Sequence, residues 1–511
     1  MSSSNAALRF ALYFAALVAF AIAVGVGAAI GLQDNPRPLF LLLLFAVCAS
    51  PLLYATHWNG PYSVLIFYAL MFLVSYGAMD FVDLFTGQRS SSSEGVLSAA
   101  EAGLLAGLIV LVLGYALAVK LTRRRTQARV PSEWPALTAL LVGISLWALG
   151  TLATYLWQVE ILNRAFQQLE GRINSYQAMA VTLGRLVQPL GLLLVAYRVF
   201  AGRSAVALLL LIAMLGVTFV VGFVGDSKEV AVQGIALVLV TSLLVSGRIP
   251  KVWLGVGTMI VLVAFPVFQA YRAEVLSFGR DRGAAAENLG ANLQKALDSR
   301  LLERGEDIYG ARSFLDRVSI KRTFERIVTD VGVTAEYQNG YTVSLLFSGM
   351  IPRVLWPDKP DTSVGQLFNR ELGISAFRDV FISVTHFGDL YWNFGWVGLL
   401  GGALLMGILL GTIGSRFDLA EHRSVTRILV LTITIYLLVA RMEQNIAMSY
   451  LVWLRSMIAV AALHIVFSRR SSTAPPAGLP EQRSSPPSDA SPLTLSATTI
   501  QRSFRSTQRS G

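Results

Sequence analysis

The sequence predicts an all-α polytopic membrane protein, and its composition and its long apolar runs are the observations that predict this class. The chain has 511 residues, of which 54% are hydrophobic and only 14% are charged. A soluble protein typically carries about 25% charged residues. Many apolar runs reach or approach the roughly 20 residues that a helix needs to span a bilayer. Counting soluble domains from chain length therefore does not apply.

These runs predict about twelve transmembrane spans. They cover approximately 8–31, 38–56, 61–79, 99–119, 135–157, 178–198, 204–224, 230–247, 252–271, 393–414, 427–443 and 448–467. The first run is too long for the apolar core of a signal peptide, so we interpret it as an uncleaved span. The only cysteine, Cys48, falls inside a predicted span, so no disulfide can form within the chain.

The placement of Lys and Arg predicts the orientation of the spans. With a cytoplasmic N-terminus, the short inner connections hold fifteen of these residues and the short outer connections hold six. Cytoplasmic connections are enriched in basic residues, so we expect both ends of the chain to lie inside. The net charge of +11 then mostly reflects topology, and we expect no nucleic-acid partner.

Four regions follow from this layout: spans one to nine over 1–271, a large outer loop over 272–392, spans ten to twelve over 393–468, and a tail over 469–511. Within the loop, 286–308 and 311–331 have apolar residues at helical spacing and predict two amphipathic helices, the second with Phe324 and Ile327 on its apolar face. IPRVLWPDKPD, residues 351–361, contains three prolines and predicts irregular structure. The tail is rich in Ser and Pro and predicts cytoplasmic disorder.

Basic residues within the predicted spans are candidate functional groups, because a charge in hydrocarbon costs several kcal/mol. Arg185 and Arg455 lie about two turns from the outer face, and Lys228 and Arg441 lie at outer span ends. Four cations near one leaflet suit an anionic ligand such as a diphosphate, which arginine binds in a bidentate fork. The alternative is that each cation extends to the interface or pairs with a carboxylate such as Glu443.

His386 is the one histidine that we predict on the outer side, and Asp389 follows three residues later, shortly before span ten. Either group could accept a proton from a sugar hydroxyl near neutral pH. The alternative is a histidine that orders the edge of the loop through hydrogen bonds. The aromatic residues that follow, Tyr391 among them, fit an interfacial aromatic belt and can also stack on sugars.

Several reaction classes have no motif in the chain. It contains no GxxxxGK[ST] loop, no HExxH pair and no Cys/His cluster that could hold zinc. It also lacks the Asp-x-Asp pair with which many nucleotide-sugar transferases bind a divalent metal. We therefore expect no cofactor and no metal, and a reaction that draws its energy from an already activated donor.

Two motifs carry a resemblance to a known family. IPRVLWPDKPD resembles the Ile-Pro-Arg-x-Leu-Trp-Pro-x-Lys-Pro segment of the Wzy-type oligosaccharide repeat-unit polymerases of O-antigen and exopolysaccharide synthesis. GDLYWNFG, residues 388–395, is similar to the Gly-x-x-Tyr-x-Asn-Phe-Gly entry into their next span. Arg317 and Gly340 stand at matching places upstream, and GDSKE, with Lys228, is similar to a further Gly-x-Arg/Lys element. The motifs cover about 320–400, and the span layout covers most of the chain.

The resemblance implies a GT-C-like glycosyltransferase of the bacterial inner membrane, acting at the periplasmic face without a metal. Its donor would be a growing glycan on undecaprenyl diphosphate, and its acceptor would be one lipid-linked repeat unit. A flippase and a chain-length regulator of the same pathway would be possible partners, alongside membrane lipid.

The expected site joins the cations with this chemistry. His386, Asp389 and Arg353 are the candidate catalytic residues, with Arg353 and Lys359 closing over the phosphates from the loop. The candidate contacts to the diphosphate and the glycan are Arg185, Lys228, Arg317, Lys359, Arg441, Arg455, Trp356 and Tyr391. The alternative for 352–360 is that it only ties the loop to the membrane surface.

Three other functions stay open from sequence. An O-antigen ligase would use the same lipid carrier and share the layout. A flippase or other secondary transporter would fit twelve spans, although transporters keep functional groups near the midplane and the predicted spans lack carboxylates there. A scaffold for polysaccharide assembly would need no catalytic groups at all.

Overall fold

The computed structural model describes much of the transmembrane part and the second half of the large loop. The described residues are 13–26, 37–54, 60–86, 97–122, 134–164, 175–202, 204–224, 228–248, 250–259, 319–352, 355–356, 358–374, 381–420 and 423–467. All of them belong to one compact unit, Met1–Arg469. The tail predicted over 469–511 and the loop helix predicted over 286–308 lie outside the described residues.

Helices make up the described part of the chain, and its single bridge joins Val331 to Ala335. Before the loop lie α2 (Arg37–Ala49), α3 (Pro51–Tyr54), α4 (Ser63–Thr86), α5 (Ala99–Thr122), α6 (Ala136–Arg164), α7 (Ser175–Gly202), α8 (Ala205–Val224) and α9 (Lys228–Ser246). The loop contributes α15 (Lys321–Asp330), α16 (Tyr341–Met350) and α17 (Gly365–Leu372). The remainder forms α18 (His386–Arg416), α19 (Val425–Thr434), the π-helix η1 (Ile435–Ala440) and α20 (Ile446–Phe467).

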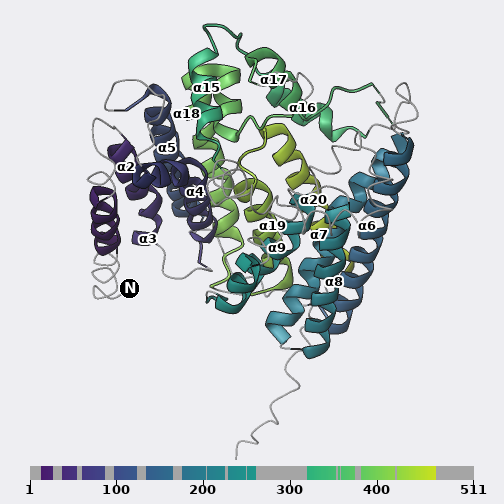
Figure 1. Cartoon of the computed structure of the whole chain (residues 1–511). Coiled ribbons are helices and arrows are strands. Elements are labelled where there is room, and N and C mark those ends of the chain that lie inside the picture. Colours follow the sequence, from purple (N-terminus) through teal and green to yellow (C-terminus); the bar gives the residue numbers. More distant parts are fainter. Residues whose placement is uncertain are drawn as a thin grey trace, which may run out of the picture. The chain divides into compact units, whose positions relative to one another are not determined.

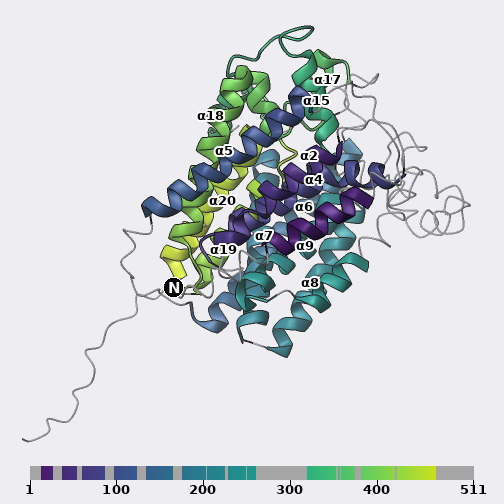
Figure 2. The ribbon, with the colours of Figure 1, turned by 90° about the vertical axis from the view of Figure 1, so that its left-hand side faces the viewer.

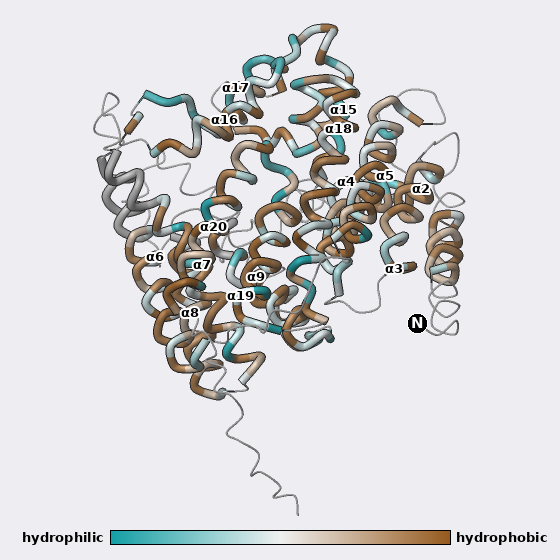
Figure 3. The backbone as a smooth tube through the Cα atoms, turned by 180° about the vertical axis from the view of Figure 1, so that it is seen from behind, coloured by the Kyte–Doolittle hydropathy of each residue, from teal (hydrophilic) through white to brown (hydrophobic). Residues whose placement is uncertain are grey.

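Seven of the described helices are long and apolar enough to cross a membrane, which supports an all-α membrane protein. They are Ser63–Phe85, Ala99–Thr122, Ala136–Thr154, Thr182–Gly202, Ala205–Gly222, His386–Arg416 and Ile446–Phe467. Figure 3 shows apolar residues along most of the length of these helices. Four other predicted spans correspond to shorter apolar helices, Tyr13–Val26, Pro38–Tyr54, Val232–Ser246 and Val425–Ala440. Of the span predicted over 252–271, the structure describes a helix only at 251–259.

Two helices extend beyond the predicted span limits. The helix expected to begin at 393 begins at His386, because the Thr385 side chain caps it by accepting a 2.9 Å hydrogen bond from the Gly388 N–H. The helix expected to end at 79 continues to Thr86, so Asp80 lies inside a candidate span. Asp80 is tolerated there because its carboxylate pairs with a lysine distant in sequence, which no local pattern reveals.

The helices of this unit pack in two groups of closely contacting pairs. α5 runs alongside α18, and Figures 1 and 2 both show these two helices side by side. α6 contacts α7 along its length, and α7 in turn contacts α8 and α9. α19, η1 and α20 join the two groups, since α19 contacts α7 and α9 while η1 contacts α4.

The loop helices lie against the start of α18, and Figure 1 shows α15 to α17 together at that end of the long helices. α15 confirms the described part of the second predicted amphipathic helix, with Phe324 and Ile327 fully buried against the membrane helices. α16 contacts both α18 and α20. The described residues of 351–361 form turns and irregular backbone, as their prolines predict.

Candidate functional site: a basic cavity

A cavity of about 330 Å³ lies between α6, α7, α9, η1 and α20. Three of the predicted cations, Arg185, Arg441 and Arg455, line it together. The described residues that line this arginine cavity include no carboxylate, and most of its other walls are apolar, with Leu237 and Leu451 as examples. The cavity therefore combines fixed positive charge with apolar surface inside the helical bundle.

A second cavity, of about 370 Å³, adjoins the first beneath the loop. Thr182, Thr362, Leu451 and Arg455 line both cavities. The loop cavity adds Lys359 and Asp361 from the proline-rich segment. The structure thus brings Lys359 close to the arginine cavity and adds a carboxylate that the sequence had not singled out.

Arg185 reaches the cavity because α7 lies very close to α6. Gly184 of α7 directly precedes Arg185, and its carbonyl oxygen faces Gly150 of α6. A Cβ on Gly150 would lie 2.5 Å from that oxygen, so only glycine at position 150 permits this close contact between the helices. Small residues allow such close packing between membrane helices. Pro189 within α7 lacks the N–H that would bond the Arg185 carbonyl four residues earlier. Both features shape the wall where Arg185 lies.

Arg441 follows directly after η1. Single π-helical turns inside α-helices are rare and recur at functional sites. This turn directs Tyr436 and Leu437 to the arginine cavity, and the Arg441 guanidinium lies 5.9 Å from the centre of the Tyr436 ring. The Gln444 N–H donates a 3.1 Å hydrogen bond to the Arg441 carbonyl, which orders the turn after η1.

Arg455 and Lys359 meet at the C-terminal end of α16. The Arg455 guanidinium donates a hydrogen bond to the Gly349 carbonyl. The Lys359 ammonium donates to the same carbonyl over 3.2 Å and to the Ile351 carbonyl over 2.6 Å. Carbonyls at a helix C-terminus carry partial negative charge and favour cations. This shared contact anchors two cations at the boundary between the cavities.

Asp389, a predicted base, lies outside both cavities. It is completely buried, and its carboxylate accepts hydrogen bonds from the Thr342 hydroxyl, the Asn393 amide at 3.1 Å and the Ile446 N–H at 2.9 Å. It therefore ties α16, α18 and the start of α20 together. This geometry favours a structural role over the catalytic role that we predicted.

His386 is also buried away from the cavity lining, with 1% of its surface exposed. Its ring lies 5.9 Å from that of Tyr450, edge to face, and neither ring nitrogen has a hydrogen-bond partner among the described residues. Tyr391 packs edge to face on Trp396 at 4.8 Å, and Trp356 is partly exposed outside both cavity linings. The structure does not join these three predicted site residues to the arginines.

Three further predicted site residues are not located. Arg317 and Arg353 lie outside the described residues. Lys228 is the first residue of α9, but its side chain lies outside the described part. The described core of the predicted site is therefore Arg185, Arg441, Arg455 and Lys359.

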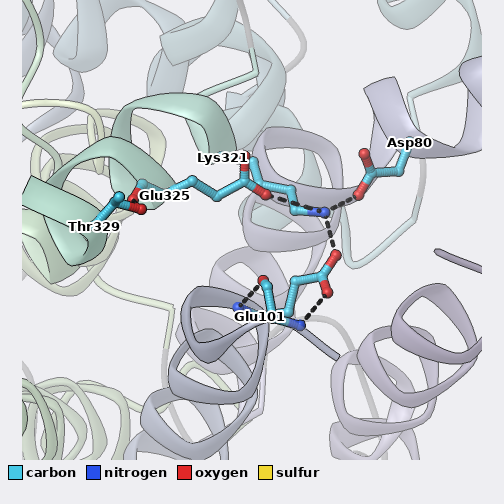
Figure 4. Close-up of polar contacts among 6 residues, drawn as sticks. Asp80, Glu101, Lys321, Glu325 and Thr329 are labelled. Carbon is cyan, nitrogen blue, oxygen red and sulfur yellow. Dashed lines mark hydrogen bonds and ion pairs between the residues drawn. The ribbon is translucent and has the colours of Figure 1, made fainter. Parts of the chain in front are cut away.

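Sequence reasoning missed a buried charge cluster that fastens the loop to the bundle. The Lys321 ammonium on α15 bonds to the Asp80 carboxylate on α4 and, at 2.6 Å, to the Glu101 carboxylate on α5 (Figure 4). Glu325 lies 3.6 Å away, one turn further along α15. Burial alone would lower the pKa of Lys321, but attraction to these three carboxylates outweighs it and raises the pKa above its usual value.

A local signal for Glu101 was present in the sequence. Ser98 and Glu101 form a capping box, in which the Ser98 hydroxyl accepts from the Glu101 N–H and the Glu101 carboxylate accepts from the Ser98 N–H. No comparable pattern marks Asp80 or Lys321. Among the described residues, no group of three or more His, Cys, Asp or Glu side chains could hold a metal ion.

Comparisons of the chain with protein-family models, with curated proteins and with solved structures found no match.

Proposed function

We propose that the protein is a polysaccharide polymerase of the bacterial inner membrane. It transfers a growing glycan from undecaprenyl diphosphate to a lipid-linked repeat unit at the periplasmic face. The observation that carries the proposal is the shared cavity of Arg185, Arg441 and Arg455, which adjoins Lys359. A prenyl diphosphate has an anionic head and an apolar tail, and the lining offers cations and apolar walls to match.

The reaction breaks the bond between the donor's anomeric carbon and the diphosphate oxygen. A hydroxyl oxygen of the acceptor forms the new bond to that carbon, and the hydroxyl proton passes to a base. Undecaprenyl diphosphate leaves with additional negative charge. Fixed cations that face this developing charge lower the barrier, and they act more strongly in a cavity with few competing waters. We assign this role to the three arginines.

We assign the base to Asp361. It is the carboxylate that the described lining of the two cavities supplies, and it lines the loop cavity together with Lys359 and Arg455. His386 and Asp389 are buried elsewhere, so they cannot reach an acceptor that occupies this space. A general base contributes about 10²–10⁴-fold to such a reaction.

The experiment is extension of purified lipid-linked repeat units by the full-length protein in detergent or nanodiscs, read as a ladder of products. Arg185→Ala is the sharpest variant, because the Arg185 side chain is exposed and lines the arginine cavity. Removing one transition-state contact should slow extension by about 10²-fold or more. Arg370→Ala, on α17 outside both cavity linings, is the matched control and should extend normally.

Two results would count against the proposal. A wild-type protein that builds no ladder from any lipid-linked repeat unit would remove the polymerase assignment. A ladder that is equally strong in the Arg185 and Arg370 variants would show that the arginine cavity does not serve the reaction. Transfer of glycan to a lipid A core acceptor without any ladder would identify a ligase instead.

A further inference from the structure

α16 is an apolar helix within a charged loop. Its ten residues, YTVSLLFSGM, include no Asp, Glu, Lys or Arg. Several large apolar side chains of α16 and the turn after it are nevertheless exposed, with 72% of Phe347 and 76% of Leu355 accessible. Met350, Ile351 and Trp356 add to this exposed surface. A surface of this kind marks contact with a membrane or with another protein.

The first turn of α16 is tied to the start of α20. The Thr342 hydroxyl donates to the Asp389 carboxylate, and the same carboxylate accepts from the N–H of Ile446, the first residue of α20. All three groups are buried. The N-terminal end of α16 therefore lies level with the N-terminal end of a candidate membrane span.

The last turn of α16 lies further along α20. A Cβ on Gly349 would lie 2.5 Å from the Leu451 side chain, and the Gly349 carbonyl accepts from Arg455. Leu451 is five residues beyond the first residue of α20, and at 1.5 Å per residue this is about 7.5 Å along its axis. Gly349 consequently lies deeper along α20 than Thr342 does.

α20 sets the depth of this contact in the membrane. Its 22 residues have a length of about 33 Å, close to the roughly 30 Å of hydrocarbon in a bilayer, so its first residue must lie near one membrane surface. We propose that α16 enters that leaflet, and that acyl chains cover the face formed by Phe347, Met350, Ile351, Leu355 and Trp356.

This arrangement explains the composition of the segment. Charged side chains would be costly at this depth, and α16 has none. The Gly349 carbonyl in its last turn, which lipid cannot satisfy, accepts hydrogen bonds from Arg455 and Lys359. Met350 and Pro352 also line the loop cavity, so the inserted segment separates that cavity from lipid. The proposal is independent of the proposed function.

Site-specific labelling in nanodiscs tests the proposal. Cys48 is the only cysteine, so a Cys48→Ala background accepts single cysteines carrying an environment-sensitive fluorophore such as NBD. The test positions are Phe347→Cys and Leu355→Cys. Val333→Cys, 81% exposed in the turn after α15, is the water-exposed control. Leu209→Cys, 68% exposed within the candidate span of α8, is the lipid-exposed control.

Labels at 347 and 355 should resemble the label at 209. We expect blue-shifted emission, strong quenching by lipids with a nitroxide near the top of the acyl chain, and weak quenching by iodide. The label at 333 should show the opposite pattern. Emission at 347 and 355 that matches 333 would overturn the proposal. Labels there that neither lipid nitroxide nor iodide can quench would also overturn it, because protein would then cover the face.

Discussion

The ammonium group of Lys321 lies 2.6 Å from the Glu101 carboxylate, although 220 positions separate the two residues in the chain. Asp80 bonds to the same ammonium, and the Lys321 side chain is only 7% exposed. This buried cluster joins α15 of the loop to α4 and α5. Asp80 lies near the end of α4 and Glu101 near the start of α5, and the sequence predicts both of these helix ends on the same side of the membrane as the large loop.

Lys321→Met should destabilise the protein strongly, because it leaves two buried carboxylates without their cation. Breaking one partner of a buried pair typically costs about 3–5 kcal/mol. Thermal unfolding in detergent measures the effect as a fall in Tm. The triple variant Lys321→Met, Asp80→Asn, Glu101→Gln removes the lysine and both carboxylates that bond to it, and it should regain most of the loss. If the single variant unfolds like wild type, the cluster does not hold the loop.

The stabilisation that Lys321 provides should decrease at high pH. The pKa of Lys321 lies above its ordinary value of 10.5. A raised lysine pKa stabilises the fold fully below the unfolded value, and this stabilisation is lost as the pH rises through the folded value. The Tm difference between wild type and Lys321→Met should therefore stay constant from about pH 7 to 10 and shrink only above about pH 10.5. A difference that shrinks between pH 7 and 9 would contradict this assignment.

Substitution of Asp361 should mainly reduce activity, whereas substitution of Asp389 should mainly reduce stability. Asp361→Asn should slow glycan extension by about 10²-fold or more, since a base is lost at a cavity wall, and should lower Tm less than Asp389→Ala does. Asp389→Ala should lower stability by about 1–3 kcal/mol for each buried donor left unpaired. Extension rates and thermal unfolding of both variants separate the roles. A stable but inactive Asp389→Ala protein would restore Asp389 as the base.

Gly395 should not tolerate a side chain. Its φ of 61° and ψ of −147° interrupt α18 in a region that is nearly restricted to glycine, so Gly395→Ala should cost about 1–3 kcal/mol. Gly401 lies in the same helix with open space around its Cα, so Gly401→Ala is the control and should be neutral or slightly stabilising. Equal Tm values for the two variants would show that the interruption of α18 carries no such strain.

The motif around Gly395 illustrates how a sequence pattern and its physical role can differ. GDLYWNFG was predicted to contribute catalytic and sugar-binding groups. In the structure Asn393 and Asp389 hold Thr342, and Gly388 leaves room for Ile327 of α15, where a Cβ would lie 2.5 Å away. The described contacts of these residues therefore fasten the loop to α18 rather than line the cavity.

The sequence by itself determined the helical class, most of the long apolar helices and the position of Arg185 and Arg455 within candidate spans, because length and hydropathy along one helix decide whether it fits a bilayer. Only the tertiary structure decided which charges meet. Asp80, Glu101 and Lys321 come from three distant segments, and Arg441 reaches the arginine cavity through a π-helical turn. Burial and pairing of charge depend on packing between helices. The spacing of apolar residues along a single helix does not predict which helices pack together.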